Sequence, residues 1–219
     1  MMKLLSQAIK GLSVILLGFV LAACSDTDGP AEDLVGTAAS GAATLGMIYV
    51  VDADGAEMSR AINTDGSFKF DVRKMTAPFM LKTVASNGTD PDLYSFAEDS
   101  NVIVNVTPLT NIMMFIAYNE LDPKDLYDSW LNEHGTITDT VIKAAQAAVN
   151  ANLHTQFTAF SLNPLTYDFN GTRFLTNGTS IDGLLDEMLV DISGGTIDIS
   201  VTGLGALTFD TGIDITGYD

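Results

Sequence analysis

The stretch Thr64-Asp65-Gly66-Ser67-Phe68-Lys69-Phe70-Asp71-Val72 predicts the fold of the first half of the chain. Asp-Gly is a dipeptide that supplies the positive φ angles of a tight hairpin turn. After it, Phe68, Phe70 and Val72 alternate with three polar residues, which places the apolar set on one face of a strand. The stretch is therefore typical of a β-hairpin whose second strand covers a core with one face.

Short apolar segments punctuated by glycine continue this pattern on both sides. A second turn signal, Asp54-Gly55, lies between two further candidate strands. Met47 to Val51 is apolar without a break, as expected for a central strand that is covered on both faces. We expect strands over 35–38, 47–52, 58–63, 67–72, 79–85, 93–97 and 102–106. So many short strands with tight turns between them predict an antiparallel β-sandwich.

Several of these residues resemble a known family. Gly36-Thr37-Ala38, the apolar strand to Val51, Asp54-Gly55 and Thr64 to Phe68 are together similar to a carboxypeptidase-regulatory-like domain over residues 34–85. The resemblance implies a small transthyretin-like β-sandwich that serves as a binding or spacer module without catalytic activity. Leu45-Gly46-Met47-Ile48 departs from the small residues that this family usually has around its first hairpin.

Helix signals begin at Thr107-Pro108, where a threonine N-cap precedes a proline in the first turn. Asp122-Pro123 repeats this arrangement before a helix whose one side carries Leu126, Tyr127, Trp130 and Leu131. Thr136 and Asp139 predict a capping box for a third helix. The third helix has an apolar stripe at helical spacing, formed by Val141, Ala145, Ala148, Val149 and Leu153.

The C-terminal part combines a helix with strands. After a loop over 163–179, Ser180 is expected to cap a helix that runs to about Val190. Its inward residues are expected to be Ile181, Leu184, Leu185, Met188 and Leu189. The alternation from Thr196 to Asp210 predicts a final hairpin, which either completes the N-terminal sheet or covers the helices.

The expected fold class is therefore α+β: an N-terminal antiparallel β-sandwich, then a mainly helical unit and a short C-terminal β-hairpin. The expected domains are a signal peptide over 1–23, a flexible tether over 24–34 rich in Asp, Gly and Pro, the sandwich over 35–106, and the helical unit with its C-terminal α+β segment over 107–219.

The N-terminus has the layout of an export signal. Lys3 and Lys10 make the first residues basic, and an apolar run to Ala23 follows. That run is shorter than the roughly 20 residues of a membrane-spanning helix. Leu21-Ala22-Ala23-Cys24 resembles the lipobox of bacterial lipoproteins, which implies a diacylglyceryl thioether on Cys24, the single cysteine of the chain. The alternative is an ordinary cleaved signal that leaves Cys24 as a free thiol.

In that family, Asp directly after the cysteine favours retention in the inner membrane, and here Ser25 occupies that place. The resemblance therefore implies an outer-membrane lipoprotein whose partner is the membrane, contacted through lipid. Whether the folded part faces the periplasm or the outside stays open. An acylated Cys24 leaves no thiol for a disulfide, so packing has to stabilise the folded part.

The charge excludes one class of partner. Cleavage before Cys24 removes Lys3 and Lys10 and no acid, so the ten basic residues become eight against 28 acidic ones, a net charge of −20. Such a surface repels nucleic acid. The apolar content of 47% is too high for a disordered chain, and we expect a packed core.

The residues give weak signals for catalysis, metal binding or a cofactor, and we predict none of the three. His134 and His154 are the two histidines, and they lack the tight ligand spacing of a metal site. Asp52, Asp54 and Asp65 would suit Ca²⁺ if their turns converged, but turn residues selected for solvation explain them more simply.

Three further groups of residues have both a structural and a functional interpretation. Asp182, Asp186, Glu187 and Asp191 fit a solvated helix face, although paired carboxylates also serve glycoside hydrolysis. The sequons at Asn87, Asn170 and Asn177 fit turns in a bacterial protein. Six aromatic residues would stack on sugars if exposed, but we expect them in the core: Tyr94, Phe96, Tyr127, Trp130, Tyr167 and Phe169.

The sequence thus predicts a lipid-anchored protein of the cell envelope with a noncatalytic binding, scaffolding or surface-display role and an envelope protein or a glycan as partner. Two alternatives stay open. One is a small hydrolase that acts on envelope or extracellular polymers, and the other is a subunit of a secretion or surface assembly.

Overall fold

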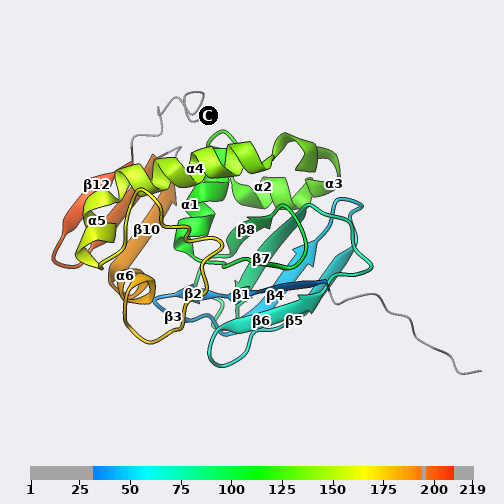
Figure 1. Cartoon of the computed structure of the whole chain (residues 1–219), viewed down its shortest axis with the longest axis horizontal. Helices are drawn as coiled ribbons and strands as arrows, with labels where there is room; N and C mark the ends of the chain where they lie inside the picture. The colour runs from blue at the N-terminus through cyan, green and yellow to red at the C-terminus, as the bar shows by residue number, and fades with distance from the viewer. Residues whose placement is uncertain (1–31, 194–195, 210–219) are drawn as a thin grey trace, which may run out of the picture.

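The computed structural model describes residues 32–193 and 196–209 and confirms the α+β fold (Figure 1). Strands come first, helices follow, and a C-terminal group of strands ends the described chain. Cys24 and the predicted signal lie outside the described residues. Within the described part, no helix is both long and apolar enough to cross a bilayer.

The larger sheet of the sandwich is antiparallel, with the strand order β5-β4-β7-β8. Its strands are β4 (Gly46–Val51), β5 (Glu57–Ala61), β7 (Phe79–Ala85) and β8 (Leu93–Ala97). The predicted central position of β4 is confirmed, because it pairs with β5 on one side and β7 on the other. The two Asp-Gly turns lie where they were predicted, with positive φ at Gly55 and Gly66. Asp54-Gly55 joins the paired strands β4 and β5, but the hairpin predicted at Asp65-Gly66 is wrong, because this turn leads from β5 of the larger sheet into β6 of the smaller sheet.

The smaller sheet has the order β6-β1-β9, formed by β1 (Asp33–Thr37), β6 (Ser67–Asp71) and β9 (Val102–Ile103). β1 pairs antiparallel with β6 but parallel with β9, so this sheet is mixed. The alternation from Phe68 to Val72 is as predicted: Phe68, Phe70 and Val72 are buried. They pack with Ile48, Val50, Phe79 and Leu81 of the larger sheet and form the core of the sandwich.

Helices cover the opposite face of the larger sheet (Figure 1). Met80, Tyr94 and Phe96 point to this side and belong to a second core with the helices and the C-terminal strands. The helices are α1 (Pro108–Ala117), α2 (Pro123–Asp128), α3 (Trp130–Glu133), α4 (Asp139–Asn152), α5 (His154–Ala159) and, after the long loop, α6 (Ile181–Glu187). A 3-10 turn, η1 (His134–Thr136), separates α3 from α4.

The starts of α1 and α2 follow the sequence signals closely. Thr107 caps α1 with Pro108 at its first position, and Asp122 caps α2 in the same way. The capping box predicted at Thr136 is wrong: the N-cap of α4 is Thr138, whose hydroxyl accepts a hydrogen bond from the Val141 N–H. Leu131 is also not inward, because α2 ends at Asp128 and the chain restarts as α3, which leaves its side chain 57% exposed.

The C-terminal strands form a sheet of their own, with the order β10-β11-β12. They are β10 (Met188–Ser193), β11 (Thr196–Val201) and β12 (Gly205–Thr208). Ile197, Ile199 and Val201 pack into the same core as the helices, so these strands cover the helices instead of completing the sandwich. The predicted helix to Val190 is too long: it ends at Glu187, and Leu189 is 75% exposed because β10 alternates its side chains between two faces.

Loop 163–179 is without helix or strand, as predicted, and it is fixed by buried amides. The Asn105 side chain donates hydrogen bonds to the carbonyls of Phe169 and Thr172, at 3.0 and 2.8 Å, and accepts one from the Thr37 N–H. The Asn170 side chain bridges to Ser95 and Phe96 of β8. Far segments of the chain therefore meet at one edge of the larger sheet.

Candidate functional site

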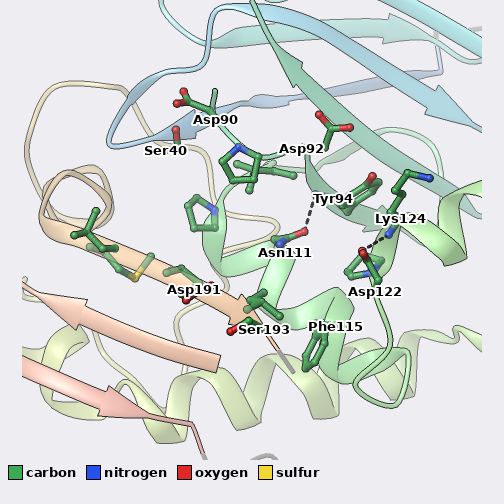
Figure 2. Close-up of a pocket in the computed structure, with 18 of the residues that line it drawn as sticks. Ser40, Asp90, Asp92, Tyr94, Asn111, Phe115, Asp122, Lys124, Asp191 and Ser193 are labelled. Atoms are coloured by element: carbon green, nitrogen blue, oxygen red, sulfur yellow. Dashed lines mark hydrogen bonds between the residues drawn. The ribbon is translucent and has the colours of Figure 1, made fainter. Parts of the chain in front are cut away.

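A groove of about 870 Å³ lies between the N-terminal end of β8, the helices α1 and α2, and strand β10 (Figure 2). We refer to it as the groove. Figure 2 shows Asp90 and Asp92 before β8 on one side, Asp122 and Lys124 at the start of α2, and Asp191 on β10. The short hairpin of β2 (Ala39–Ser40) and β3 (Ala42–Ala43) closes one end through Ser40.

Hydrogen bonds between side chains of α1 and the main chain of β8 hold these two elements together as one wall of the groove. The Asn111 Oδ1 atom accepts from the Tyr94 N–H at 3.2 Å (Figure 2), and the Thr110 hydroxyl lies 2.9 Å from the Tyr94 carbonyl oxygen. Both residues follow directly from the capped start of α1 at Thr107. The strong helix start therefore fixes one wall of the groove.

The groove is strongly acidic. Its lining holds five carboxylates and one ammonium group, from Asp90, Asp92, Glu120, Asp122, Asp191 and Lys124. Lys124 already forms an ion pair with Asp128, four residues further along α2. Burial raises the pKa of Tyr94 well above its usual range, and the charges of Asp92 and Asp122 raise it further. The negative charges of the groove therefore act on Tyr94, which forms part of the wall.

Apolar surface lies between these carboxylates. Phe115 of α1 and Pro108 contribute to the lining on one side, and Met188, Leu189, Val190 and Ile192 of β10 contribute on the other. A groove that combines apolar surface with a large excess of carboxylates suits a ligand that is both cationic and partly apolar.

The three carboxylates that would suit calcium if their turns converged, Asp52, Asp54 and Asp65, do not converge. Asp52 and Asp54 share the turn before β5, where Asp52 accepts hydrogen bonds from the main chain of Asp54, Ala56 and Thr76. Asp65 lies in the turn after β5, at the other end of that strand, and accepts from Ser67. These carboxylates therefore serve their own turns. Among the described residues, no group of three or more His, Cys, Asp or Glu side chains is placed to hold a metal ion.

The two histidines do not share a site. His134 lies in η1 with its ring 6.0 Å from the Trp130 ring, and His154 is exposed at the start of α5.

The solvated helix face expected for Asp182, Asp186, Glu187 and Asp191 is partly wrong. Asp182 is 1% exposed, because α6 packs against the loop before it and the Gly178 N–H donates to Asp182 at 2.6 Å. Asp186 and Glu187 are exposed, and Asp191 lies on β10 instead of a helix. Partial desolvation, and then the nearby charges of Asp182 and Glu187, raise the pKa of the exposed Asp186 carboxyl.

The aromatic residues are core residues, as expected. Tyr94, Phe96, Tyr127, Trp130 and Phe169 are at most 7% exposed, and Tyr167 is half-buried against Phe157. The large apolar side chains that are exposed in the described chain are aliphatic.

The sequons behave as turns at Asn87 and Asn177, whose side chains accept from main-chain N–H groups two residues later. Asn170 also lies in a turn, and its side-chain amide in addition hydrogen bonds to Ser95 and Phe96 of β8.

The sequence reasoning missed the groove. Asp122 was recognised as an N-cap, but Asp92, Glu120 and Asp191 belong to separate segments with no shared spacing. One signal did exist for β10: Val190 and Ile192 alternate with Asp191 and Ser193, which is the pattern of a strand and not of a helix.

Comparisons of this chain with protein-family models, with curated proteins and with solved structures found no match. The site therefore has to be interpreted from its own geometry and chemistry.

Proposed function

We propose that this is a lipid-anchored, noncatalytic binding protein of the bacterial cell envelope, and that its groove binds a cationic partner. The observation that carries the binding role is the lining of the groove, where five carboxylates surround apolar surface and the one lysine is already paired. The lipobox resemblance at Cys24 supports the anchor. A carboxypeptidase-regulatory-like sandwich, as suggested by the resemblance over 34–85, suits such a binding module.

The charge of the whole chain strengthens the proposal. A net charge of −18 attracts cations over the Debye length of about 8 Å at physiological salt, and a concave acidic site focuses that field. A positively charged segment of an envelope protein fits this chemistry better than a neutral glycan. Sugar binding would be supported by exposed aromatic side chains, and the exposed large apolar residues of the described chain are aliphatic.

A hydrolase is the second candidate, and one observation favours it. Glu98, Asp139 and Asp168 line a shallow pocket of about 360 Å³ on another side of the molecule. Burial raises the pKa of Glu98, and the charge of Asp139 raises it further, which is the property of a general acid. Hydrolysis of an envelope polymer that is lost in Glu98→Gln would support this role against the binding role.

The binding role is tested with the full chain in detergent micelles and a fluorescent octalysine peptide. In the double variant Asp92→Asn with Asp122→Asn, the second asparagine still caps α2, since Asn is as good an N-cap as Asp. Loss of two charges is expected to weaken binding by about fivefold to thirtyfold at low salt, at roughly 0.5–1 kcal/mol for each charge. Octaglutamate should not bind.

The matched control is the double variant Asp99→Asn with Glu133→Gln, which also removes two negative charges, but from residues that do not line the groove. Equal losses of affinity in both double variants would show that the peptide senses net charge and not the groove. No binding of octalysine to the unmodified protein at low salt would reject the proposed ligand class.

The anchor is tested separately. Cys24→Ala is expected to abolish labelling with radioactive fatty acid and partitioning into detergent, because the thioether has no other cysteine to form on. Labelling of the variant at the level of the unmodified protein would overturn the lipoprotein assignment.

A further inference from the structure

Strand β10 lies with its edge along the groove. All six of its residues, Met188 to Ser193, line the groove, and none of β11 or β12 does. A cavity over one face of the sheet would be lined by alternate residues of several strands. In the order β10-β11-β12, β11 is the one partner of β10 among the strands of residues 32–193 and 196–209. The groove therefore follows an open strand edge.

The hydrogen-bond pattern identifies which main-chain groups are free on that edge. The Thr202 N–H donates to the Glu187 carbonyl at 3.0 Å, just beyond the pair Met188 and Val201. Hydrogen-bonded and non-hydrogen-bonded pairs alternate in an antiparallel ladder, so Leu189 and Asp191 bond toward β11. Val190 and Ile192 then direct their N–H and C=O groups away from β11, and no described residue hydrogen bonds to them.

The other strand edge beside the groove is closed. At the edge of β8, Asn111 accepts from the Tyr94 N–H, the Thr110 hydroxyl lies against the Tyr94 carbonyl, and the Asn170 amide donates to the Phe96 carbonyl. An uncovered strand edge is a template for pairing with another chain, which proteins usually block. In this protein, side chains block the edge of β8. On the edge of β10, the main-chain N–H and C=O groups of Val190 and Ile192 have no hydrogen-bond partner among the described residues.

We propose that an extended basic segment of another protein binds in the groove by adding to β10 as a fourth strand of the C-terminal sheet. The proposal rests on the proposed function and specifies its ligand and binding mode. Main-chain hydrogen bonds to Val190 and Ile192 supply affinity that is independent of sequence, as in other cases of strand addition. The carboxylates around the edge select a basic segment over an acidic or neutral one.

The geometry also sets the length and pattern of the segment. Six residues of strand span about 20 Å at 3.3 Å per residue, so the segment has about six residues. Asp191 is exposed and points to the outer face of the sheet with Leu189. A lysine or arginine placed opposite Asp191 forms a favourable cross-strand pair. The residues on either side of it point to the inner face, where apolar side chains extend the layer of Val190 and Ile192. Alternating basic and apolar residues are therefore preferred.

The test uses the hexapeptide Lys-Val-Lys-Val-Lys-Val and two isomers that carry N-methyl groups on residues 1, 3 and 5 or on residues 2, 4 and 6. Each isomer loses donors along one edge of the extended peptide only. We expect one isomer to bind at least tenfold more weakly than the parent peptide, and the other to bind within threefold of it. Binding of all three peptides with equal affinity would overturn strand addition while leaving the acidic groove as a binding site for cations. No binding of the parent would reject both proposals.

Hydrogen exchange provides a second measurement on the protein itself. The Val190 and Ile192 amides should exchange more slowly by tenfold or more when the parent peptide is bound, whereas the Leu189 and Asp191 amides already bond to β11 and should change little. Val190→Pro removes the free N–H without removing a bond to β11, and it should weaken binding at least tenfold. If this variant does not fold, the methylated peptides and the exchange rates of the unmodified protein still test strand addition. Unchanged exchange at Val190 and Ile192 in the complex would overturn the proposal.

Discussion

The hydroxyl oxygen of Thr110 in α1 lies 2.9 Å from the main-chain carbonyl oxygen of Tyr94 in β8. The same hydroxyl accepts a hydrogen bond from the Thr107 N–H and so completes the capping box of α1. One buried side chain therefore starts the first helix and attaches it to the edge of the larger sheet. The helical layer and the wall of the groove both depend on this position.

Replacement of Thr110 by Val keeps the shape of the side chain but removes its hydroxyl. The Thr107 N–H and the Tyr94 carbonyl then lose a partner in a buried place, and we expect a loss of about 2 kcal/mol in the free energy of unfolding. Denaturant unfolding followed by the fluorescence of Trp130, the single tryptophan, measures this. Thr110→Ser keeps the hydroxyl and should lose less than half as much. Equal losses in the two variants would contradict the role of the hydroxyl.

Asn105 is expected to be the most sensitive polar position of the loop region. Asn105→Leu leaves the carbonyls of Phe169 and Thr172 and the Thr37 N–H without their partner, and the expected cost is about 4 kcal/mol at 1–3 kcal/mol for each group. Trypsin should also cut faster after Arg173, the basic residue of this loop. Asn87→Ala, in an exposed turn, serves as the control and should cost at most about 1 kcal/mol. An unchanged cleavage rate in Asn105→Leu would show that other contacts fix the loop.

The strands of the sandwich were predictable because their signals are local. Period-2 alternation around Phe68 and Phe70 and the two Asp-Gly turns indicate where the strands and the turns between them lie. Of these two turns, only Asp54-Gly55 closes a hairpin, because the strands on either side of Asp65-Gly66 belong to different sheets. The parallel pairing of β1 with β9 was not predictable, since it joins Leu34 to Val102 across the whole sandwich. Its partner choice depends on packing between distant segments and not on any local pattern.

The starts of α1 and α2 were predictable for the same reason, but the N-cap of α4 and the end of α6 were not. Ile181, Leu184, Leu185 and Met188 have helical spacing, and this pattern runs on into the first residues of β10. Pairing of β10 with β11 outweighs the helical preference from Met188 onward. Because the helix was extended to Val190, the strand edge beside the groove could not be recognised from the sequence.

A pH-dependent effect is expected at Asp186. The pKa of this exposed carboxyl is raised by partial desolvation first and by the charges of Asp182 and Glu187 second, so the folded state holds the proton more tightly than the unfolded state. The stabilising effect of protonation is complete below the unfolded pKa of about 3.9 and is lost as the pH rises through the folded pKa. Asp186→Asn should therefore raise Tm at pH 7 and leave it unchanged at pH 3.

Thermal melts of Asp186→Asn at the two pH values check this, with Glu133→Gln as the control for loss of a negative charge. An increase of Tm that is the same at pH 3 and pH 7 would assign the effect to the asparagine itself and not to the removed charge.

Asp191 is expected to couple stability to binding. It lies directly opposite Asp198 in the pairing of β10 with β11, and like charges at opposite positions of a sheet are destabilising. Asp191→Thr removes this repulsion, so we expect Tm to rise by about 1–3 °C. The same change removes the carboxylate that faces the proposed basic segment, so the affinity for Lys-Val-Lys-Val-Lys-Val should fall.

Asp198→Thr should raise Tm in the same way but weaken peptide binding less, because Asp198 lies one strand away from the groove edge. Thermal melts and peptide titration of both variants separate the two effects. If a basic ligand binds in the groove, the Asp191 carboxylate contributes to binding although it lowers stability. Equal peptide affinity of the unmodified protein, Asp191→Thr and Asp198→Thr would show that Asp191 is not part of the binding site.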